Sequence, residues 1–335
     1  MKSIQYKDAK RVEVGEKAAP EIGPGEVLVK VAYAGICGSD MIIYQGVHPR
    51  AKPPLVMGHE FSGVIEKGHA TLPPGTPVTA YPLLGCGHCQ PCLNGYAHVC
   101  DTLKLIGIDC DGGMAEYVKV PEDKIIPIPA GFPLKLGAFI EPVAVGVHAV
   151  SRSRYRPGDT AVVYGAGPIG LCVAGCLAYF GARRVIVIEA KPRRLDVARQ
   201  MGFTTIDAAH EDIRAKVLEY TQGRNVDLAF DCAAHPSVHT SILDILRVQG
   251  VGVVVGSYKK PAEVDLIKIE FKELTLIGTR VYEWRDFETA VAILQSGRVD
   301  FDRLLTVAAP EEAPKQFAKL LAGESDAIKM LFKFG

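Results

Sequence analysis

The sequence predicts an α/β protein in which a strand-rich first part is followed by a doubly wound parallel sheet. The chain has 335 residues, a length typical of two domains. From residue 25 to about residue 120, short strand-like segments are separated by Pro and Gly. From about residue 152, strand patterns alternate with helical patterns, as in parallel sheets whose strands are joined by helices.

The first part is predicted to be a partly open β-barrel with long loops. Valine recurs at every second position from Val27 to Val31, as in a half-buried strand. Pro and Gly follow at positions 53–54, 73–75 and 112–113, where they indicate turns between short strands. Many short strands with such turns favour an all-β region.

The second part carries the pattern of a doubly wound sheet. A helix is expected after the first of its strands and another over Arg193–Met201. The strands are expected at Thr160–Tyr164, Val185–Ile188, Thr204–Asp207, Val226–Asp231, Gly252–Val255 and Leu274–Gly278. The C-terminal part is helical and ends in a strand-like segment, Lys329–Phe334. We expect residues 1–152 and 285–335 to form one domain and residues 153–284 the other.

Composition excludes several classes of function. Lys+Arg and Asp+Glu number 38 each, so a nucleic-acid partner, which needs a basic surface, is not expected. The N-terminal segment has no apolar core typical of a signal peptide, and the apolar run Gly170–Ala182 is too short to span a bilayer. We therefore expect a cytoplasmic protein without a membrane partner. The nine cysteines favour reduced thiols over a disulfide framework.

Four of the cysteines follow the pattern C-x2-C-x2-C-x7-C, at Cys86, Cys89, Cys92 and Cys100. Short spacings of this kind place four thiolates around one tetrahedral Zn²⁺. Because four thiolates leave no open position, such a zinc is structural. The alternatives are an iron–sulfur cluster, a nucleic-acid-binding zinc ribbon and four unrelated buried cysteines.

A second group of metal-binding residue types is spread over the first part of the chain. Cys37 follows the first valine-rich strand, His59 lies about twenty residues later, and Glu141 precedes the second domain. A thiolate, an imidazole and a carboxylate would make a three-ligand zinc site with one open position. Taken singly, each of them is as well explained as an ordinary buried residue.

A glycine-rich loop follows the strand that begins the second domain. Gly165, Gly167 and Gly170 form the pattern G-x-G-x-x-G between a predicted strand and a predicted helix, with Pro168 and Ile169 between the last two glycines. In this context the pattern predicts a turn that brings a pyrophosphate to the helix N-terminus. Glu189 ends the next predicted strand, where a carboxylate can accept hydrogen bonds from the adenosine ribose. It would repel a 2′-phosphate, so NAD is favoured, although the nearby Arg194 leaves NADP open.

Together these motifs resemble the zinc-containing medium-chain dehydrogenase/reductase family, the alcohol dehydrogenases, and the resemblance covers essentially the whole chain. It implies a GroES-like β-barrel that forms the catalytic, zinc-binding domain (1–152 and 285–335) and a Rossmann domain that binds NAD (153–284). It also implies two zinc ions per chain: a structural one on the four cysteines, and a catalytic one on Cys37, His59 and Glu141.

Further site residues follow from the same resemblance. Glu60 is similar to the family's alternate zinc ligand, so whether Glu60 or Glu141 holds the zinc at rest stays open. Asp40 resembles the carboxylate that orients the ligand histidine, and Ser39 the hydroxyl that contacts the substrate alcohol. Ile42 stands where many relatives have a histidine, which leaves the outer proton path undefined. Around the nicotinamide, the resemblance implies contacts from Gly256, Ser257 and Arg280.

The implied activity is oxidation of an alcohol, with hydride transfer to NAD. A glutamate as third ligand is similar to the polyol, threonine and sugar-acid branches, and the local sequence looks most like L-galactonate or L-gulonate 5-dehydrogenases. Sorbitol, galactitol-phosphate and threonine dehydrogenases are alternatives within the same class of enzyme. Alternatives from other classes are a zinc-free reductase and a non-enzymatic structural relative. The basic loop residues His48, Arg50 and Lys52 suggest a carboxylate on the substrate, with Arg280 as a second candidate and an ordinary solvated loop as the alternative. The resemblance also implies a homodimer or homotetramer, in which we expect pairing through Gly252–Gly278.

Overall fold

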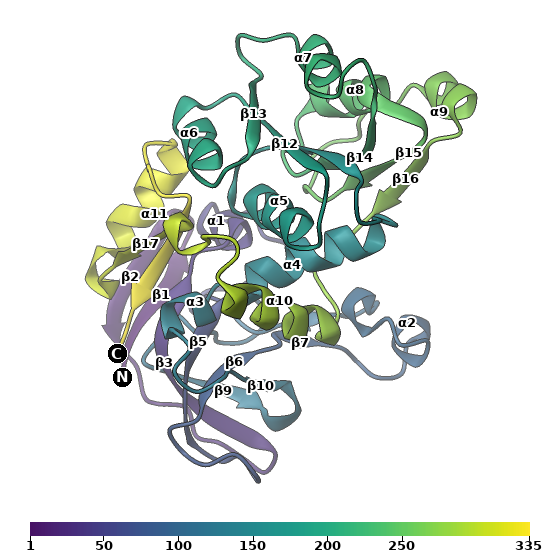
Figure 1. Cartoon of the computed structure of the whole chain (residues 1–335). Helices are drawn as coiled ribbons and strands as arrows, with labels where there is room; N and C mark the ends of the chain where they lie inside the picture. The colour runs from purple at the N-terminus through teal and green to yellow at the C-terminus, as the bar shows by residue number, and fades with distance from the viewer. The chain divides into compact units, whose positions relative to one another are not determined.

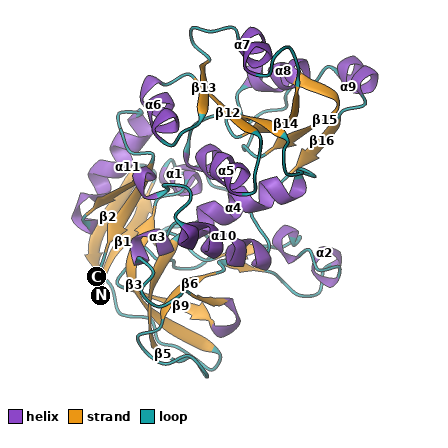
Figure 2. Cartoon of the chain, viewed as in Figure 1, coloured by secondary structure: helices purple, strands orange, loops and turns teal.

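A computed structural model describes residues 1–335, and the chain divides into two units, each with its own sheet structure (Figures 1 and 2). Unit 1 comprises residues 1–141 and 304–335, and unit 2 comprises residues 142–303. None of the helices is both long enough and apolar enough to cross a membrane.

Unit 1 is built around one long central strand, β3 (Glu26–Gly35). Its side chains Val27, Val29 and Val31 are fully buried or nearly so, as the valine alternation predicts. β3 pairs antiparallel with β5, β9 and β18, within a sheet ordered β10-β6-β5-β3-β18-β17. The remaining strands form the sheets β2-β1-β4 and β7-β8. The predicted strand at the C-terminus is therefore confirmed, and it completes the sheet of the first part of the chain.

The elements of unit 1 have the following bounds. The strands are β1 (Lys2–Asp8), β2 (Arg11–Glu16), β4 (Leu55–Val56), β5 (Phe61–Lys67), β6 (Pro77–Ala80), β7 (Leu83–Leu84), β8 (Lys104–Leu105), β9 (Tyr117–Pro121), β10 (Ile125–Pro127), β17 (Leu305–Ala308) and β18 (Lys329–Lys333). The α-helices are α1 (Gly38–Tyr44), α2 (Gln90–Leu93), α3 (Leu134–Gly137) and α11 (Ala313–Ala322). The 3₁₀ turns are η1 (Ala97–Val99), η2 (Glu122–Lys124), η3 (Asp302–Leu304) and η4 (Pro310–Glu312). The first two residues of η3 belong to unit 2 and its last residue to unit 1.

Unit 2 is a six-stranded parallel sheet in the order β13-β12-β11-β14-β15-β16, the doubly wound arrangement that the alternating pattern predicts. The strands are β11 (Thr160–Tyr164), β12 (Arg184–Glu189), β13 (Thr204–Asp207), β14 (Val226–Asp231), β15 (Leu246–Val254) and β16 (Thr275–Gly278). The helices are α4 (Ile140–Arg152), which starts at the end of unit 1, α5 (Pro168–Tyr179), α6 (Pro192–Gln200), α7 (Ile213–Tyr220), α8 (Pro236–Ile245), α9 (Leu266–Lys272) and α10 (Trp284–Ser296).

One hydrophobic core fills one face of this sheet. Val162 and Tyr164 of β11 contribute to it together with Val217 of α7 and Ile242 of α8. Side chains alternate across a strand, so Val163 points to the opposite face, on which α5 contacts β11. The sheet is thus covered on both faces, which leaves the ends of its strands as the places where a ligand can bind.

The unit boundaries differ from the predicted domain boundaries because α4 and α10 group with the parallel sheet. His148 of α4 and Asp286 of α10 form a buried pair, with Nδ1 2.8 Å from the carboxylate oxygen. Each of the two side chains is 3% exposed. A buried, hydrogen-bonded pair of this kind ties the two helices to each other within unit 2.

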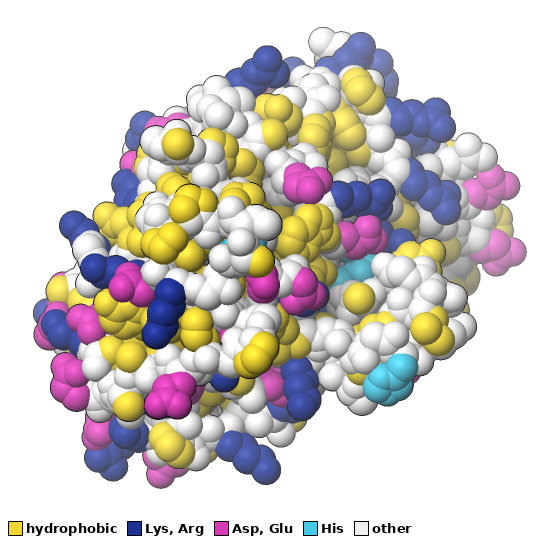
Figure 3. Space-filling view, turned by 90° about the horizontal axis from the view of Figure 1, so that it is seen from below, with side chains coloured by type: hydrophobic (Ala, Val, Ile, Leu, Met, Phe, Trp, Pro, Cys, Tyr) yellow, Lys and Arg dark blue, Asp and Glu magenta, His cyan; other side chains and the backbone are white.

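Charged side chains of both signs occur together on the molecular surface. On the face shown in Figure 3, Lys and Arg side chains lie interspersed with Asp and Glu. The formal net charge of the whole chain is zero.

Candidate functional site

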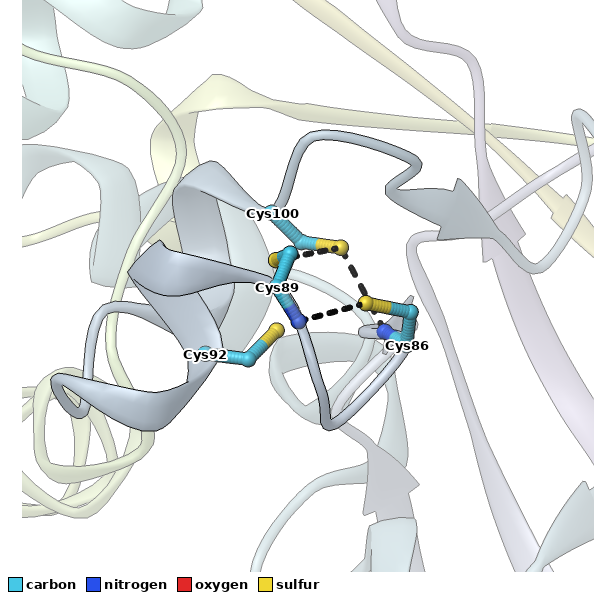
Figure 4. Close-up of side chains that lie close together, drawn as sticks. All are labelled: Cys86, Cys89, Cys92 and Cys100. Atoms are coloured by element: carbon cyan, nitrogen blue, oxygen red, sulfur yellow. Dashed lines mark hydrogen bonds between the residues drawn. The ribbon is translucent and has the colours of Figure 1, made fainter.

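The four predicted structural cysteines converge in one loop of unit 1, between β7 and β8 (Figure 4). The ligand atoms of Cys86, Cys89, Cys92 and Cys100 all lie within 4.8 Å of one another. The Sγ atoms of Cys89 and Cys100 are 3.7 Å apart. A tetrahedral zinc site with bonds of about 2.3 Å has sulfur–sulfur edges of about 3.8 Å, so the cluster has the size that zinc requires.

Backbone N–H groups around this cluster favour thiolates, the form of cysteine that binds zinc. The N–H groups of His88 and Cys89 lower the pKa of Cys86 to about 6. The N–H of Cys86 in turn donates to the Sγ of Cys100 over 3.3 Å. The four residues therefore fit a closed structural zinc site in geometry. Their protonation differs, because burial raises the pKa of Cys92 to about 12, so this thiol would need the charge of a bound cation to ionise.

Three of the predicted catalytic-zinc residues also lie together in unit 1. The ligand atoms of Cys37, His59 and Glu60 are within 4.8 Å of one another. Glu141, at the start of α4, is buried with 5% exposure, and its charge raises the pKa of His59. The Glu60 carboxylate lies at ligand distance from Cys37 and His59, so both carboxylates remain candidates for the third ligand.

The turn after β3 presents Cys37 because a short helix, α1, begins at this point. Cys37 is the N-cap residue, and its N–H donates to Oδ2 of Asp40 over 2.8 Å. This is a capping arrangement, with an acidic side chain in the first turn satisfying a free N–H group. The sequence predicted only strands and loops here, although the spacing between Cys37 and Asp40 is that of a helix N-cap and its capping residue.

The cluster of Cys37, His59 and Glu60 contains more acidic groups than basic ones. Burial alone lowers the pKa of His59, but the Cys37 thiolate and the neighbouring carboxylates outweigh it and leave this pKa well above its usual value. Burial raises the pKa of Asp40 to about 6, although His59 and the N–H of Cys37 act in the opposite direction. Nδ1 of His59 and Oδ1 of Asp40 are buried without hydrogen-bond partners. A divalent cation would supply the missing charge, so the residues fit a zinc site.

A buried lysine that sequence analysis did not identify lies beside this cluster. The ammonium of Lys329, at the start of β18, forms an ion pair with Oε2 of Glu60, and the side chains are 2% and 1% exposed. Burial alone lowers the pKa of Lys329, but Glu60 and Cys37 offset this effect and leave its pKa raised. The side chain is therefore charged. Its place depends on the pairing of β18 with β3, for which the local sequence carries no signal.

Ser39, the predicted proton-relay residue, lies in the first turn of α1, next to Asp40. Its hydroxyl is buried and has no hydrogen-bond partner. A buried hydroxyl without a partner is unfavourable, so it is available to a substrate hydroxyl. The outer position of a proton path, at Ile42, is apolar.

The predicted dinucleotide loop borders a cavity of about 580 Å³ in unit 2. Gly165, Gly167, Glu189 and Arg194 all line it. Other lining residues, which the sequence did not predict, lie on β11, at the N-cap of α8 and on α8 itself: Tyr164, His235, Ser237 and Ser241. The volume is in the range typical of small-molecule sites.

Two of the loop glycines are required by the backbone itself. Gly165 has a φ of +94°, in the region that favours glycine. A Cβ atom on Gly170 would lie 1.8 Å from the carbonyl oxygen of Gly165, so no other residue fits there. Gly167 is the N-cap of α5, and a Cβ there would meet only the Arg194 guanidinium, at 3.7 Å. Space is thus left for an anionic group at the helix N-terminus, beside Pro168 and Ile169 in its first turn.

Glu189 lies at the end of β12, on the wall of this cavity. Its carboxylate accepts hydrogen bonds from the N–H groups of Ala166 (2.9 Å) and Ala190 (2.8 Å). Arg194 approaches the same carboxylate with an N–O distance of 3.8 Å. The acidic group is therefore fixed by the backbone, with the arginine close to it.

The three predicted nicotinamide contacts lie beyond the ends of β15 and β16 and do not line this cavity. The N–H of Gly256 donates to the carbonyl of Asp231 over 2.8 Å, and Ser257 follows it. Arg280 is exposed, two residues after β16. Thr279, which precedes it, has a buried hydroxyl without a hydrogen-bond partner.

The basic loop between α1 and β4 is partly committed to internal contacts. The Arg50 guanidinium forms an ion pair with Asp109 at 3.1 Å and also donates to the carbonyl of Leu103. Nδ1 of His48 accepts from the N–H groups of Arg50 and Ala51. Lys52 is exposed and forms no ion pair, so it is the one cation of this loop that is free for a ligand.

Comparison with known proteins gives matches over most of the chain. The alcohol dehydrogenase GroES-like domain model matches residues 23–130, and the zinc-binding dehydrogenase model matches residues 168–296. A 2-dehydro-3-deoxy-L-galactonate 5-dehydrogenase from Pseudoalteromonas atlantica is 35% identical over 92% of this chain and 92% of its own length. An L-threonine 3-dehydrogenase from Bacillus subtilis is 35% identical over 99% and 98%.

Solved structures agree with these matches. An alcohol dehydrogenase from Escherichia coli, whose crystal structure contains the cofactor NADH, has a TM-score of 0.92 and 31% sequence identity. The alignment covers 100% of this chain and 99% of that chain.

Proposed function

Because the chain belongs to the zinc-containing medium-chain alcohol dehydrogenase family, we propose that it oxidises a secondary hydroxyl of a small polyhydroxylated substrate, with NAD as acceptor. The observation that carries this proposal is the site formed by Cys37 and His59. It combines a thiolate, an imidazole and nearby buried carboxylates with an unpartnered serine hydroxyl, that of Ser39.

In the proposed mechanism, a bound zinc would polarise the substrate hydroxyl and a bound NAD would accept the hydride. Cys37 and His59 would hold the metal, together with one carboxylate, from Glu141 or Glu60. Oγ of Ser39 would accept the proton of the substrate hydroxyl. Because Ile42 offers no acceptor further out, this proton would leave Ser39 through another group, such as water.

Unit 2 would bind the dinucleotide. The N-terminus of α5 would bind the pyrophosphate, because its N–H groups and the helix dipole favour an anion next to Gly167. Glu189 would accept hydrogen bonds from the adenosine ribose in the adjoining cavity. Gly256, Ser257 and Arg280 stay proposed contacts of the nicotinamide half.

Replacing Glu189 by glutamine should reduce the preference for NAD over NADP. The neutral amide removes the repulsion of a 2′-phosphate, and it leaves Arg194 free to pair with that phosphate. We expect the ratio of kcat/KM values for the two cofactors to fall by at least about ten-fold, which corresponds to about 1.4 kcal/mol. Steady-state kinetics with both cofactors measure this ratio. A wild-type enzyme that uses NADP better than NAD would contradict the assignment.

For the substrate, we propose a sugar acid oxidised at a secondary hydroxyl, with the neutral polyols, galactitol phosphate and threonine as alternatives. Two observations support the sugar acid. One similar protein is named as acting on 2-dehydro-3-deoxy-L-galactonate, and Lys52 is a free cation in the loop after α1. Arg50 is a weaker candidate for the carboxylate than the sequence suggests, because Asp109 already neutralises it.

The test is NAD reduction with a panel of aldonates, matching polyols, galactitol phosphate and threonine. We expect the highest kcat/KM with an aldonate and a raised KM for it in Lys52→Ala, with no change for the matching polyol. Lys104→Ala, at another exposed lysine of unit 1, serves as the control. If aldonate and polyol are oxidised equally well and Lys52→Ala changes neither activity, the sugar-acid proposal is wrong. The chain would then be a general polyol dehydrogenase.

We also propose that the chain forms a homo-oligomer through β16, the edge strand of the parallel sheet. β16 pairs only with β15, so its outer N–H and C=O groups are available to a second strand. Apolar side chains near it are exposed, including Leu276 at 42% and, on α9, Phe271 at 80%. An apolar cavity of about 250 Å³ adjoins Leu276 and Val254. Exposed apolar surface next to an open strand edge favours a second copy of the chain.

Leu276→Asp should therefore convert the assembly to single chains, as measured by light scattering. Val248→Asp is the matched control, because Val248 is also exposed and apolar, at 61%, but lies near the opposite end of the neighbouring strand β15. A single-chain mass for the wild type would refute the proposal.

A further inference from the structure

A buried carboxylate at the end of β14 lies next to the dinucleotide cavity, and the proposed mechanism does not use it. Asp231 is the last residue of β14 and is 1% exposed, whereas Cys232 and Ala233, which follow it, line the cavity. A buried carboxylate is unfavourable unless hydrogen-bond donors surround it. The donors here come from the turn after β14 and from Tyr258, four residues beyond the end of β15. The carboxylate therefore connects two loops that α8 and β15 separate in the sequence.

The first of these loops, residues 232–235, forms part of the wall of the dinucleotide cavity. Oδ1 of Asp231 accepts hydrogen bonds from the N–H groups of Ala233 over 3.0 Å and of Ala234 over 2.8 Å. Ala234 has a φ of +50°, a conformation that residues other than glycine rarely adopt. The loop also packs on the glycine-rich turn, since a Cβ on Gly165 would lie 3.3 Å from the Cβ of Ala233. The carboxylate thus holds this wall of the cavity in place.

The second loop, which follows β15, is held by the same residue. The N–H groups of Val255 and Gly256 both donate to the backbone carbonyl of Asp231, over 3.0 and 2.8 Å. The hydroxyl of Tyr258 donates to Oδ2 of the carboxylate over 2.5 Å. Burial raises the pKa of Tyr258, and the neighbouring carboxylate raises it further, so the phenol stays protonated and acts as the donor. The side chain of Tyr258 is therefore an anchor of this loop in addition to the backbone.

We propose that Tyr258 is a positioning residue of the cofactor site, whose hydrogen bond to Asp231 holds the loop after β15 in place for the nicotinamide half of NAD. The inference rests on the proposed binding of NAD by unit 2. Two proposed nicotinamide contacts, Gly256 and Ser257, lie on this loop directly before Tyr258. A loop that is ordered in advance loses less conformational entropy when the ligand binds. Without the hydroxyl, more of this cost falls on the binding step, and the dinucleotide binds more weakly.

The test is the dissociation constant of NADH, measured by the fluorescence of the bound cofactor, which depends neither on zinc nor on turnover. Tyr258→Phe removes the hydroxyl and keeps the ring, which lies edge-on to His239 at a centroid distance of 6.4 Å. We expect the dissociation constant to rise about ten-fold, or about 1.4 kcal/mol, as for the loss of one hydrogen bond. In turnover, KM for NAD should rise, while KM for the alcohol substrate stays unchanged. Tyr155→Phe is the matched control, because its hydroxyl donates to the carbonyl of Phe180 over 3.0 Å and Tyr155 does not line the cavity.

A variant that merely disturbed the fold of unit 2 would weaken every ligand of the cavity, so a second ligand is needed. AMP carries only the adenosine half of the cofactor, and its dissociation constant, measured by isothermal titration calorimetry, should be the same in Tyr258→Phe as in the wild type. AMP binding that weakens as much as NADH binding would overturn the inference. If the wild type binds no NADH, the proposed NAD site itself fails, and the inference fails with it. If the wild type binds NADH and Tyr258→Phe binds it equally well, only the inference fails.

Discussion

Replacing His59 by alanine is expected to lower kcat/KM by at least about a thousand-fold, or about 4 kcal/mol of transition-state stabilisation. The imidazole is one of the two non-carboxylate ligands in the cluster with Cys37 and Glu60. Without it, zinc is bound by too few ligands to stay in place and polarise a hydroxyl. Metal analysis should show a fall from two zinc ions per chain to one.

The fold of this variant should remain intact. His59 lies in the short segment between β4 and β5, so no strand pairing depends on its side chain. Circular dichroism and the thermal unfolding midpoint would check this. His210→Ala removes a surface histidine whose side chain is 76% exposed, and it should change neither zinc content nor turnover. Retention of both zinc ions and of activity in His59→Ala would contradict the assignment of the catalytic site.

Replacing Cys89 by serine is expected to act on stability first. A structural zinc contributes its binding free energy to folding, and the loop between β7 and β8 has only a two-residue strand at each end to hold it. Loss of this zinc should destabilise unit 1 by several kcal/mol and lower its unfolding midpoint by about 10 °C. Metal analysis should again show one zinc fewer, while the catalytic zinc and part of the turnover remain.

The matched control for this variant is Cys110→Ser. Cys110 is an exposed free cysteine outside the four-cysteine cluster, so its replacement should change neither the zinc content nor the unfolding midpoint. Differential scanning calorimetry on both variants makes the comparison. An unchanged unfolding midpoint together with two zinc ions in Cys89→Ser would argue against a structural metal.

Local sequence predicted much of the parallel sheet. Strand β11 covers the predicted span Thr160–Tyr164, and β13 and β14 match their predicted spans as well. These buried strands lie between turns and helices, so continuous apolar runs mark them clearly. The first part of the chain was harder, because α1 is short and its start is marked only by the capping carboxylate of Asp40.

Sequence periodicity predicts the helices next to the parallel sheet, but not the unit to which each of them belongs. Periodicity places α10 correctly as a helix, but it does not tell which unit the helix packs against. Within unit 2, the buried pair between His148 and Asp286, residues far apart in the sequence, joins α10 to α4. The compact units consequently differ from the predicted domain boundaries at both ends of unit 2.

The sequence by itself predicted the four-cysteine cluster and the dinucleotide loop, because both depend on short spacings along the chain. Cys86 and Cys89 lie in one turn, and Gly165 and Gly170 lie in another. The widely spaced set of Cys37, His59 and Glu141 came only from the resemblance to a family. Only the tertiary structure decided that Glu60 lies at ligand distance from Cys37 and His59, and that Lys329 pairs with it. The physical reason is that a charge can be buried only beside its partner, and here that partner arrives through the pairing of β18 with β3.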